Sequence, residues 1–336
     1  MNLLRYIIAG RLQRNFIILP QNEVVLDVPG GSLLYAGVGA AIWENGIGLI
    51  GRVGEDYPQT WLEKISSLGF DCLGIRVLPQ TLDLRTFIYY SDYETPHLDN
   101  PVGHFARLGI PFPKTLLGYT IPSPQMDSRT QSGPLNIRLN EIPEGYLDAT
   151  AAHLCPLDYI NHTLLPSSLR QLGHITTVMV DSSPGYMNPI FWDDMPMIVK
   201  DLTAFHTSEE KITNLFQGRS KDLWEMAEAL ASYGCEIIVI KRHARGQYVY
   251  DHTSHSRWIL PAYPARVYDT TGAGDAFCGG FLAGYRNTYS ALEAALHGNI
   301  SASLSIEGSD PFYALHALPG LAQARLENLR QSIRKV

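Results

Sequence analysis

Apolar runs of strand length alternate with longer segments of helical spacing along most of this chain of 336 residues. The β-branched run at 236–241 is typical of a parallel strand buried on both faces, and residues 223–232 before it repeat apolar positions at helical spacing. This alternation predicts an α/β fold in which helices cover both faces of a mostly parallel sheet. We also predict strands at 6–9, 48–50, 151–154, 177–180 and 247–251, and helices at 33–44 and 59–67 and within 157–172, 290–306 and 321–334.

Two alternating stretches, 16–28 and 84–92, lack the helix that follows the other strands, so the residues alone favour an edge hairpin. Eight prolines interrupt residues 93–145, which excludes long regular elements there. We expect this stretch to be a surface insertion or a loop region that covers a substrate. The whole chain, 1–336, is expected to form a single domain.

The composition argues against nucleic-acid-binding and membrane-spanning proteins. With 45% hydrophobic and 18% charged residues, the chain can bury a large core. A net charge of −7 and the lack of a Lys/Arg run argue against a nucleic-acid partner. No apolar run reaches the roughly 18 to 20 residues of a membrane span and no export signal is visible, so we expect a cytoplasmic protein without a membrane partner.

The segment 269–275, with the sequence Asp-Thr-Thr-Gly-Ala-Gly-Asp, runs directly into an apolar stretch of helix length. Backbone N–H groups at the start of a helix have no intrahelical partner, so Gly272, Ala273 and Gly274 predict an anion site. Asp275 can simply cap the helix, but beside a bound phosphoryl group it can also accept the proton of an attacking hydroxyl. The turn therefore predicts phosphoryl transfer, with helix capping as the alternative reading of its spacing.

The complete string 269–277 resembles the C-terminal signature of the ribokinase-like (PfkB-type) carbohydrate kinases, and Gly30-Gly31 together with residues 46–56 resembles their N-terminal signature. This resemblance implies a ribokinase-like three-layer αβα sandwich, with 16–28 and 84–92 forming a small β lid. It also implies an ATP-dependent kinase that uses Mg²⁺ to phosphorylate a hydroxyl of a sugar or sugar-like small molecule, with Asp275 as general base. A monovalent cation such as K⁺ near Asp269 and a homodimer through the lid strands are further implications.

The resemblance assigns the acceptor to Asn15, Gly30, Gly31, Tyr35 and Asp275. Asn15 stands where many relatives have Asp, so it can hydrogen-bond a hydroxyl but lacks the charge that strengthens such bonds. Tyr35 stands where relatives often have Asn. Its ring would favour the apolar face of a sugar, a cyclitol or a nucleobase, although core packing explains an aromatic residue there equally well.

The donor nucleotide and its metal ion are also assigned by the resemblance. An Asn-x-x-Glu string that organises magnesium-bound water in the family matches residues 205–210 without the Asn, which implies Glu210, or Glu209 one register away. A helix capped by Thr207 or Ser208 is the alternative. Asn299 is otherwise a satisfied polar residue between helices. The residues assigned to the nucleotide are Lys241, Arg245, Gly246, Thr271, Gly272, Gly274, Asn299 and Ser303.

Two other functions stay open at this point. The first is a nucleoside kinase of the same fold, which Asn15 and Tyr35 permit. The second is a ligand-binding regulator that has kept the fold and lost catalysis, which the intact 272–275 turn argues against.

Overall fold

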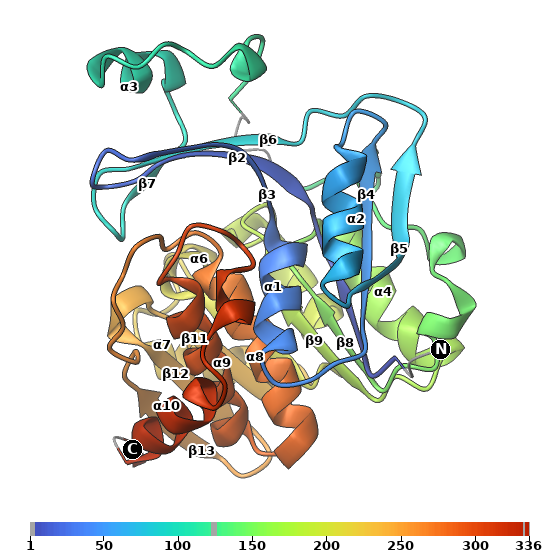
Figure 1. Ribbon diagram of the computed structural model, residues 1–336. Helices are drawn as coiled ribbons and strands as arrows, with labels where there is room; N and C mark the ends of the chain where they lie inside the picture. Colours follow the sequence, from blue (N-terminus) through green and yellow to red (C-terminus); the bar gives the residue numbers. More distant parts are fainter. Residues whose placement is uncertain (1–3, 122–125, 332, 336) are drawn as a thin grey trace.

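The computed structural model describes residues 4–121, 126–331 and 333–335, and in these ranges it contains two sheets of unequal size (Figure 1). The large sheet has the strand order β14-β13-β12-β11-β10-β9-β8-β1-β4-β5. Every neighbouring pair from β11 to β5 is parallel, whereas β12, β13 and β14 form an antiparallel edge. The predicted α/β class with a mostly parallel sheet is confirmed. The strands are β1 Tyr6–Ala9, β4 Ile47–Gly54, β5 Asp71–Leu78, β8 Ala151–Leu154, β9 Thr177–Asp181, β10 Ala204–Ser208, β11 Ile237–Lys241, β12 Gln247–Asp251, β13 Ser256–Leu260 and β14 Arg334–Lys335.

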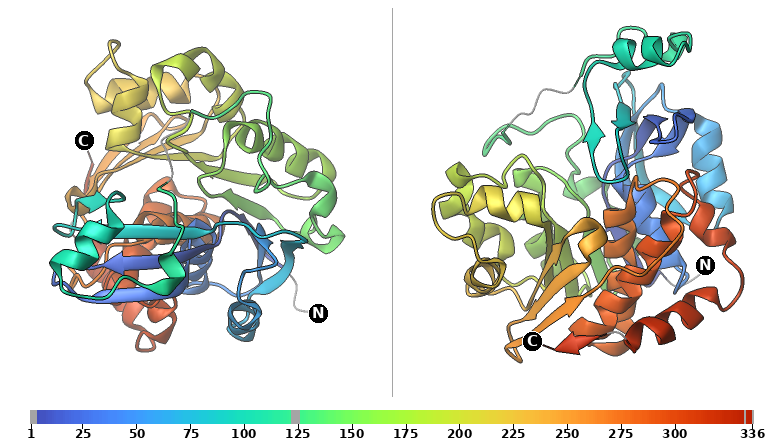
Figure 2. Two further views of the ribbon diagram at one scale, coloured as in Figure 1. Left: turned by 90° about the horizontal axis from the view of Figure 1, so that it is seen from above. Right: turned by 90° about the vertical axis from the view of Figure 1, so that its left-hand side faces the viewer.

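Helices cover both faces of the large sheet and bury two separate cores (Figures 1 and 2). Strand β11 shows why its sequence is apolar throughout: Ile237 and Val239 pack into one core, and Ile238 and Ile240 into the other. The expected three layers are therefore present. One face carries α1 Ser32–Ala41, α2 Gln59–Ser67, α8 Ala273–Thr288, α9 Ala291–Ser305 and α10 Leu321–Arg330, and the other carries α4 Tyr159–Leu172, α5 Met195–Val199, α6 Glu209–Leu215 and α7 Leu223–Ala231.

The small sheet, here called the lid sheet, has the order β3-β2-β6-β7 and lies at the upper left of Figure 1. Its strands are β2 Gln13–Ile18, β3 Val24–Gly30, β6 Arg85–Tyr90 and β7 Pro96–His97. One apolar face, with Phe16 and Phe87, packs against Phe105 of α3 (Pro101–Arg107) and Leu116. A segment of the same chain therefore covers that face of the lid sheet, as the second view in Figure 2 also shows.

The Pro-rich stretch forms only short elements where the structure describes it. Apart from α3 it has 3-10 turns at Lys114–Leu116, Leu139–Glu141 and Glu144–Tyr146, and Pro122 and Pro124 lie outside the described residues. The buried guanidinium of Arg52 on β4 fixes the return to the core, because it donates to the carbonyl oxygens of Pro134 at 2.6 Å and Asn136 at 3.0 Å and pairs with Glu141 at 3.2 Å. This stretch is therefore anchored at both ends, on the lid sheet and on β4.

The end of β3 and the whole of β5 are among the features that the sequence did not predict. Strand β3 continues to Gly30, so only Gly31, with φ +98°, makes the turn into α1. Strand β5, at the edge of the sheet, was missed because much of it is exposed and its polar residues hide the strand pattern. Within the part of the chain that the structure describes, none of the helices has the length and apolarity needed to cross a membrane.

Candidate active site

A cavity of about 700 Å³ lies beside the carboxyl ends of β9, β10 and β11, between these strand ends, the start of α8 and the lid sheet. Open parallel sheets commonly bind ligands at this edge, because loops and helix N-termini converge there. Tyr90, Tyr93 and Pro96 line it from the lid side, and Gly272, Ala273, Gly274 and Asp275 line it from α8.

The turn before α8 depends on glycine at position 272. Gly272 has φ +76°, and a Cβ there would lie 2.1 Å from the ring of Tyr35. The amide of Ala273 donates to the carbonyl of Thr270 at 3.2 Å, and the amide of Ala276 donates to the carbonyl of Gly272 at 2.9 Å. Of the three amides predicted to face an anion, those of Gly272 and Gly274 are therefore the ones available to a ligand.

Asp275 stands in the first turn of α8 and faces the cavity. Burial, and then the negative charge of Asp181, raise the pKa of Asp275 to about 6, while Lys241 and Lys211 act in the opposite direction. A carboxylate with this pKa is ionised at neutral pH and binds a proton more readily than an ordinary Asp. The site can therefore take a proton from a bound hydroxyl.

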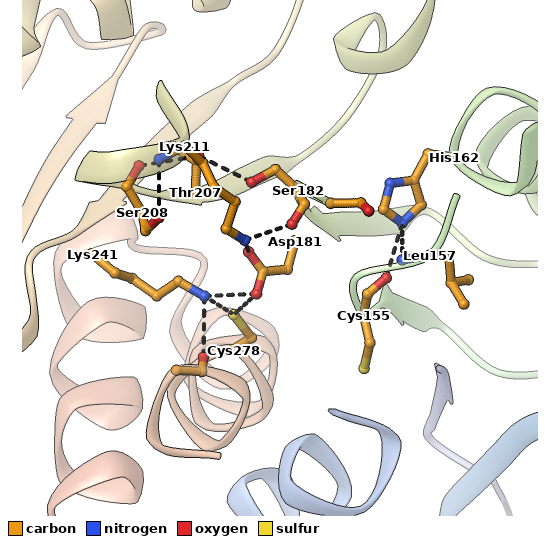
Figure 3. Close-up of polar contacts among 12 residues, drawn as sticks. Cys155, Leu157, His162, Asp181, Ser182, Thr207, Ser208, Lys211, Lys241 and Cys278 are labelled. Atoms are coloured by element: carbon orange, nitrogen blue, oxygen red, sulfur yellow. Dashed lines mark hydrogen bonds and ion pairs between the residues drawn. The ribbon is translucent and has the colours of Figure 1, made fainter. Parts of the chain in front are cut away.

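Asp181, Lys211 and Lys241 form a charged cluster at the cavity wall (Figure 3). Asp181 ends β9 and is buried, and its Oδ2 accepts from Lys241 Nζ at 2.7 Å. Lys211 Nζ lies 3.7 Å from Asp181 Oδ1 and donates to the carbonyl of Ser182 at 2.6 Å. Burial would raise the pKa of Asp181, but the two lysines outweigh it and hold that pKa below its usual range. The carboxylate thus stays charged and fixes both ammonium groups beside Asp275.

Sequence reasoning found Lys241 but missed Asp181 and Lys211. Asp181 directly follows the apolar run predicted as a strand, so its place at the carboxyl end of a parallel strand was a usable signal. Lys211 gave none, because only the fold brings α6 next to β9 and β11.

The residues assigned to the nucleotide occupy different places around the cavity. Thr271 Oγ1 lies 3.0 Å from the hydroxyl of Tyr90. This contact joins the lid sheet to residues 269–275, here called the phosphate turn after the anion site predicted for it. Arg245 is exposed and pairs with Glu209 at 2.5 Å, away from this wall. The assigned residues that line the cavity are Lys241, Gly246, Gly272, Gly274, Asn299 and Ser303.

The side chains at the far end of the cavity are occupied by the protein itself. The amide of Asn299 accepts from the backbone N–H of Tyr263 at 2.9 Å and donates to Gln247 at 3.0 Å and to the carbonyl of Pro261 at 2.7 Å. The hydroxyl of Ser303 donates to the carbonyl of Ile300 at 2.8 Å. Both residues shape this end of the cavity. The side-chain amide of Asn299 is also fully hydrogen-bonded within the protein, as expected of a satisfied polar residue.

The start of α6 resolves the register of the two glutamates. Ser208 caps the helix, because its hydroxyl accepts from the backbone N–H of Lys211 at 3.2 Å. Glu209 pairs with Arg242 and Arg245, whereas Glu210 lines the cavity. In the described ranges no group of three His, Cys, Asp or Glu side chains could hold a metal ion directly. Of these two glutamates, Glu210 is therefore the one at the cavity, and its part in ordering magnesium-bound water stays a prediction.

The residues assigned to the acceptor lie behind the phosphate turn. Asn15 is buried on β2 beside a register shift, and a Cβ on Gly30 would lie 2.1 Å from its Nδ2. Tyr35 is buried on α1 against Gly272. Asn15, Gly30, Gly31 and Tyr35 thus form a packed layer that does not line the described cavity, and their part in acceptor binding stays a prediction.

Comparisons with known proteins agree with this geometry. Residues 166–316 match the family model described as pfkB family carbohydrate kinase. A cytidine kinase from Thermococcus kodakarensis is 28% identical over 286 residues, which is 84% of this chain and 89% of that protein. A ribokinase II structure from E. coli in complex with ATP and Mg²⁺ has a TM-score of 0.67 at 16% identity, covering 98% of this chain and 100% of that one. A nucleoside kinase from Burkholderia thailandensis in complex with inosine has a TM-score of 0.66 at 18% identity, covering 96% and 98%.

Proposed function

We propose that the chain is a kinase of the pfkB carbohydrate kinase type, which transfers the γ-phosphoryl group of ATP to a hydroxyl of a sugar or nucleoside. The observation that carries this proposal is Asp275, which faces the cavity beside the amides of Gly272 and Gly274. A base and an anion site within one helix turn are what phosphoryl transfer to an alcohol requires.

In this mechanism the acceptor hydroxyl gives its proton to Asp275 while its oxygen attacks the γ-phosphorus. The amides of Gly272 and Gly274 donate to the phosphoryl oxygens as charge shifts toward the leaving ADP. A bound Mg²⁺ would neutralise charge on the phosphates, and Glu210 fits as a ligand to its waters because its carboxylate lines the cavity. The proton later leaves Asp275 for solvent.

A monovalent cation fits next to Asp269 in this proposal. Asp269 is buried, its Oδ1 accepts from the amide of Thr271 at 2.9 Å, and its Oδ2 has no partner in the described part of the chain. A buried carboxylate oxygen without a partner is a suitable ligand for K⁺. Turnover should then rise when K⁺ replaces Na⁺ at constant ionic strength.

Two specific observations favour a nucleoside as acceptor over a free sugar. The cytidine kinase matches along most of both chains. The lid wall of the cavity presents Tyr90, Tyr93 and Pro96, which give a nucleobase an apolar and aromatic surface. We therefore propose cytidine-like nucleosides as the first acceptors to test.

The experiment is ADP release from Mg-ATP with cytidine, uridine, inosine, adenosine, ribose and myo-inositol, each against a blank without acceptor. Acceptor-dependent release with a nucleoside supports the proposal. Release only with ribose or myo-inositol would support a kinase reaction but contradict a nucleoside as the acceptor. Binding of ATP with no release for any acceptor would favour a regulator.

Cytoplasmic location and a homodimer stay proposals. For the dimer, the covered face of the lid sheet matters, because Phe16 and Phe87 already pack against Phe105 of the same chain. A dimer through the lid would have to use the strand edges instead. Analytical ultracentrifugation gives the oligomeric state.

A further inference from the structure

The cavity wall next to Asp275 carries more positive charge than its own fixed carboxylate balances. Lys211 and Lys241 both line the cavity, and both ammonium groups point toward the single carboxylate of Asp181 (Figure 3). Burying charge is unfavourable unless it is paired. The two lysines share the single negative charge of Asp181, so one positive charge is left to be balanced by Asp275 when that residue is ionised, or by an anionic ligand.

The two lysines differ in their contacts, because Lys241 has more hydrogen-bond partners than Lys211. Lys241 Nζ is held at three points, by Asp181 Oδ2 at 2.7 Å, by the carbonyl of Gly274 at 3.3 Å and by Cys278 Sγ at 3.4 Å. Lys211 Nζ is held by the carbonyl of Ser182 at 2.6 Å and is 3.7 Å from Asp181 Oδ1, which has no hydrogen-bond partner among the described residues. Lys241 thus lies against the phosphate turn itself, and Lys211 lies across Asp181 from it.

The position of Lys211 follows from the helix cap. Ser208 caps α6, and its hydroxyl accepts from the backbone N–H of Lys211, the third residue after it, so the cap fixes where Lys211 leaves the first helix turn. Glu210 lies one residue earlier and Glu209 is occupied by arginines. At this register the chain therefore presents a fixed positive charge to the cavity.

We propose that Lys211 and Lys241, positioned by Asp181, form a two-lysine clamp that binds the γ-phosphoryl group of the donor nucleotide beside Asp275. This inference rests on the proposed function and deepens it. Charged hydrogen bonds to phosphate are among the stronger ones, and they gain strength where water is excluded.

The clamp also couples to the proton transfer. Before the reaction, two lysines face two carboxylates, Asp181 and Asp275. When Asp275 takes the hydroxyl proton, one negative charge disappears, and the clamp then faces the transferring phosphoryl group with one positive charge in excess. The new acceptor O–P bond forms, the bond from the γ-phosphorus to the bridging oxygen breaks, and ADP keeps the electron pair.

The test compares the affinity of ADP with that of the non-hydrolysable β,γ-imido analogue of ATP by calorimetry with Mg²⁺ present. For Lys211→Met and Lys241→Met we expect analogue affinity to fall roughly 10- to 100-fold, the usual loss of a charged hydrogen bond, while ADP affinity changes far less. Lys221→Met removes an exposed lysine away from the cavity and is the matched control. An unchanged ratio of the two affinities in both variants would overturn the clamp.

A second readout separates the positioning role of Asp181 from a structural one. The charged groups that act on Asp275 are Asp181 of β9, Lys241 of β11 and Lys211 of α6. The other titratable groups coupled to it are Tyr35 of α1, Cys155 after β8 and Cys278 of α8, which stay neutral because burial raises the pKa of each. Lys211→Met removes a positive charge, so the acid limb of kcat should move to higher pH. Asp181→Asn removes a negative charge, so the limb should move to lower pH. Shifts of the same sign would contradict the assigned charges.

Misfolding does not block this test. If Lys241→Met fails to fold, Lys211→Met still retains the bond from Lys241 to Asp181, and the double variant Lys211→Met with Asp181→Asn leaves no unpaired carboxylate. Both should still lose the preference for the analogue over ADP.

If the wild type shows no turnover with any acceptor but the preference depends on the lysines, the clamp stands and the proposed kinase reaction fails. If the wild type shows turnover and the preference for the analogue does not depend on the lysines, the kinase reaction stands and the clamp fails.

Discussion

The phosphate end of the cavity is built from strand ends and a helix start, whereas the lid end is built from a small sheet and aromatic side chains. At the phosphate end, Asp181 ends β9 and Lys241 ends β11, the two strands on either side of β10. Asp275 belongs to α8, which packs on the main sheet. At the lid end, Tyr90 and Tyr93 belong to a segment that touches the main body through few polar contacts. The comparison teaches that, in the proposed reaction, the base and the phosphate contacts belong to elements of the main sheet, whereas the surface offered to the acceptor belongs to the small sheet.

The largest effect should come from removing the base at the phosphate end. In Asp275→Asn the amide cannot accept the hydroxyl proton, so kcat should fall on the order of 10²- to 10⁴-fold. ADP affinity should stay within about twofold, since the phosphate amides remain. Steady-state kinetics and calorimetry check both, with Asp148→Asn on an exposed carboxylate as control. Near-normal kcat in Asp275→Asn would contradict the placement of the general base at the phosphate end of the cavity.

The next effect tests how tightly the phosphate turn is packed. In Gly272→Ala the new Cβ would lie 2.1 Å from the Tyr35 ring at a φ of +76°, so the turn must shift. Strain of this kind costs about 1–3 kcal/mol in stability, and a displaced anion donor costs on the order of 10²-fold in rate.

Gly218→Ala is the matched control for Gly272→Ala. Gly218 has nearly the same φ, +80°, and no atom lies within 4 Å of the added Cβ. Thermal unfolding and kcat should therefore show the strain in both variants but the rate loss in Gly272→Ala alone. Equal rates in the two variants would contradict the close packing on Tyr35.

A smaller effect concerns the anchor of the Pro-rich stretch on β4. Arg52→Met leaves the carbonyls of Pro134 and Asn136 and the carboxylate of Glu141 without their buried donor. We expect the free energy of unfolding to fall by roughly 3 kcal/mol, the scale of breaking a buried ion pair, with kcat of the folded enzyme little changed. Denaturant unfolding measures the loss, and exposed Arg138→Met provides the control. A variant as stable as the wild type would show that this segment is held elsewhere.

The smallest effect is expected where the lid sheet meets the phosphate turn. Tyr90→Phe removes the hydroxyl that lies 3.0 Å from Thr271 Oγ1 and keeps the ring. One neutral hydrogen bond contributes about 1 kcal/mol, so KM for the acceptor should rise about fivefold while kcat stays close to that of the wild type. Tyr93→Phe is the control. A loss in kcat larger than the change in KM would indicate that Tyr90 acts in the chemical step and not in acceptor binding.

The same contrast explains what could be predicted from the sequence. The buried parallel strands at 6–9 and 151–154 have the predicted bounds, because burial on both faces makes such runs apolar throughout. The phosphate turn was found because its glycines and Asp275 are neighbours in sequence. Of the proposed clamp only Lys241 was assigned from the sequence, since Asp181, Lys211 and Lys241 come together only when three parallel strands align.

The lid end was the harder region for a local reason. Asn15 sits where the pairing of β2 with β3 shifts register, so alternation along the strand does not reveal which way its side chain points. Tyr35 was open to two interpretations, and the structure places it in the packed layer under Gly272.

The measurement that tests the central claim most directly is the pH dependence of a single turnover with saturating Mg-ATP and acceptor. Because the base must be ionised, the rate in the wild type should rise with pH and level off above an apparent pKa of about 6. In Asp275→Asn this limb should disappear together with most of the rate. A wild-type rate that does not change between about pH 5 and about pH 8, or the same limb in the variant, would contradict the assignment of Asp275 as the general base.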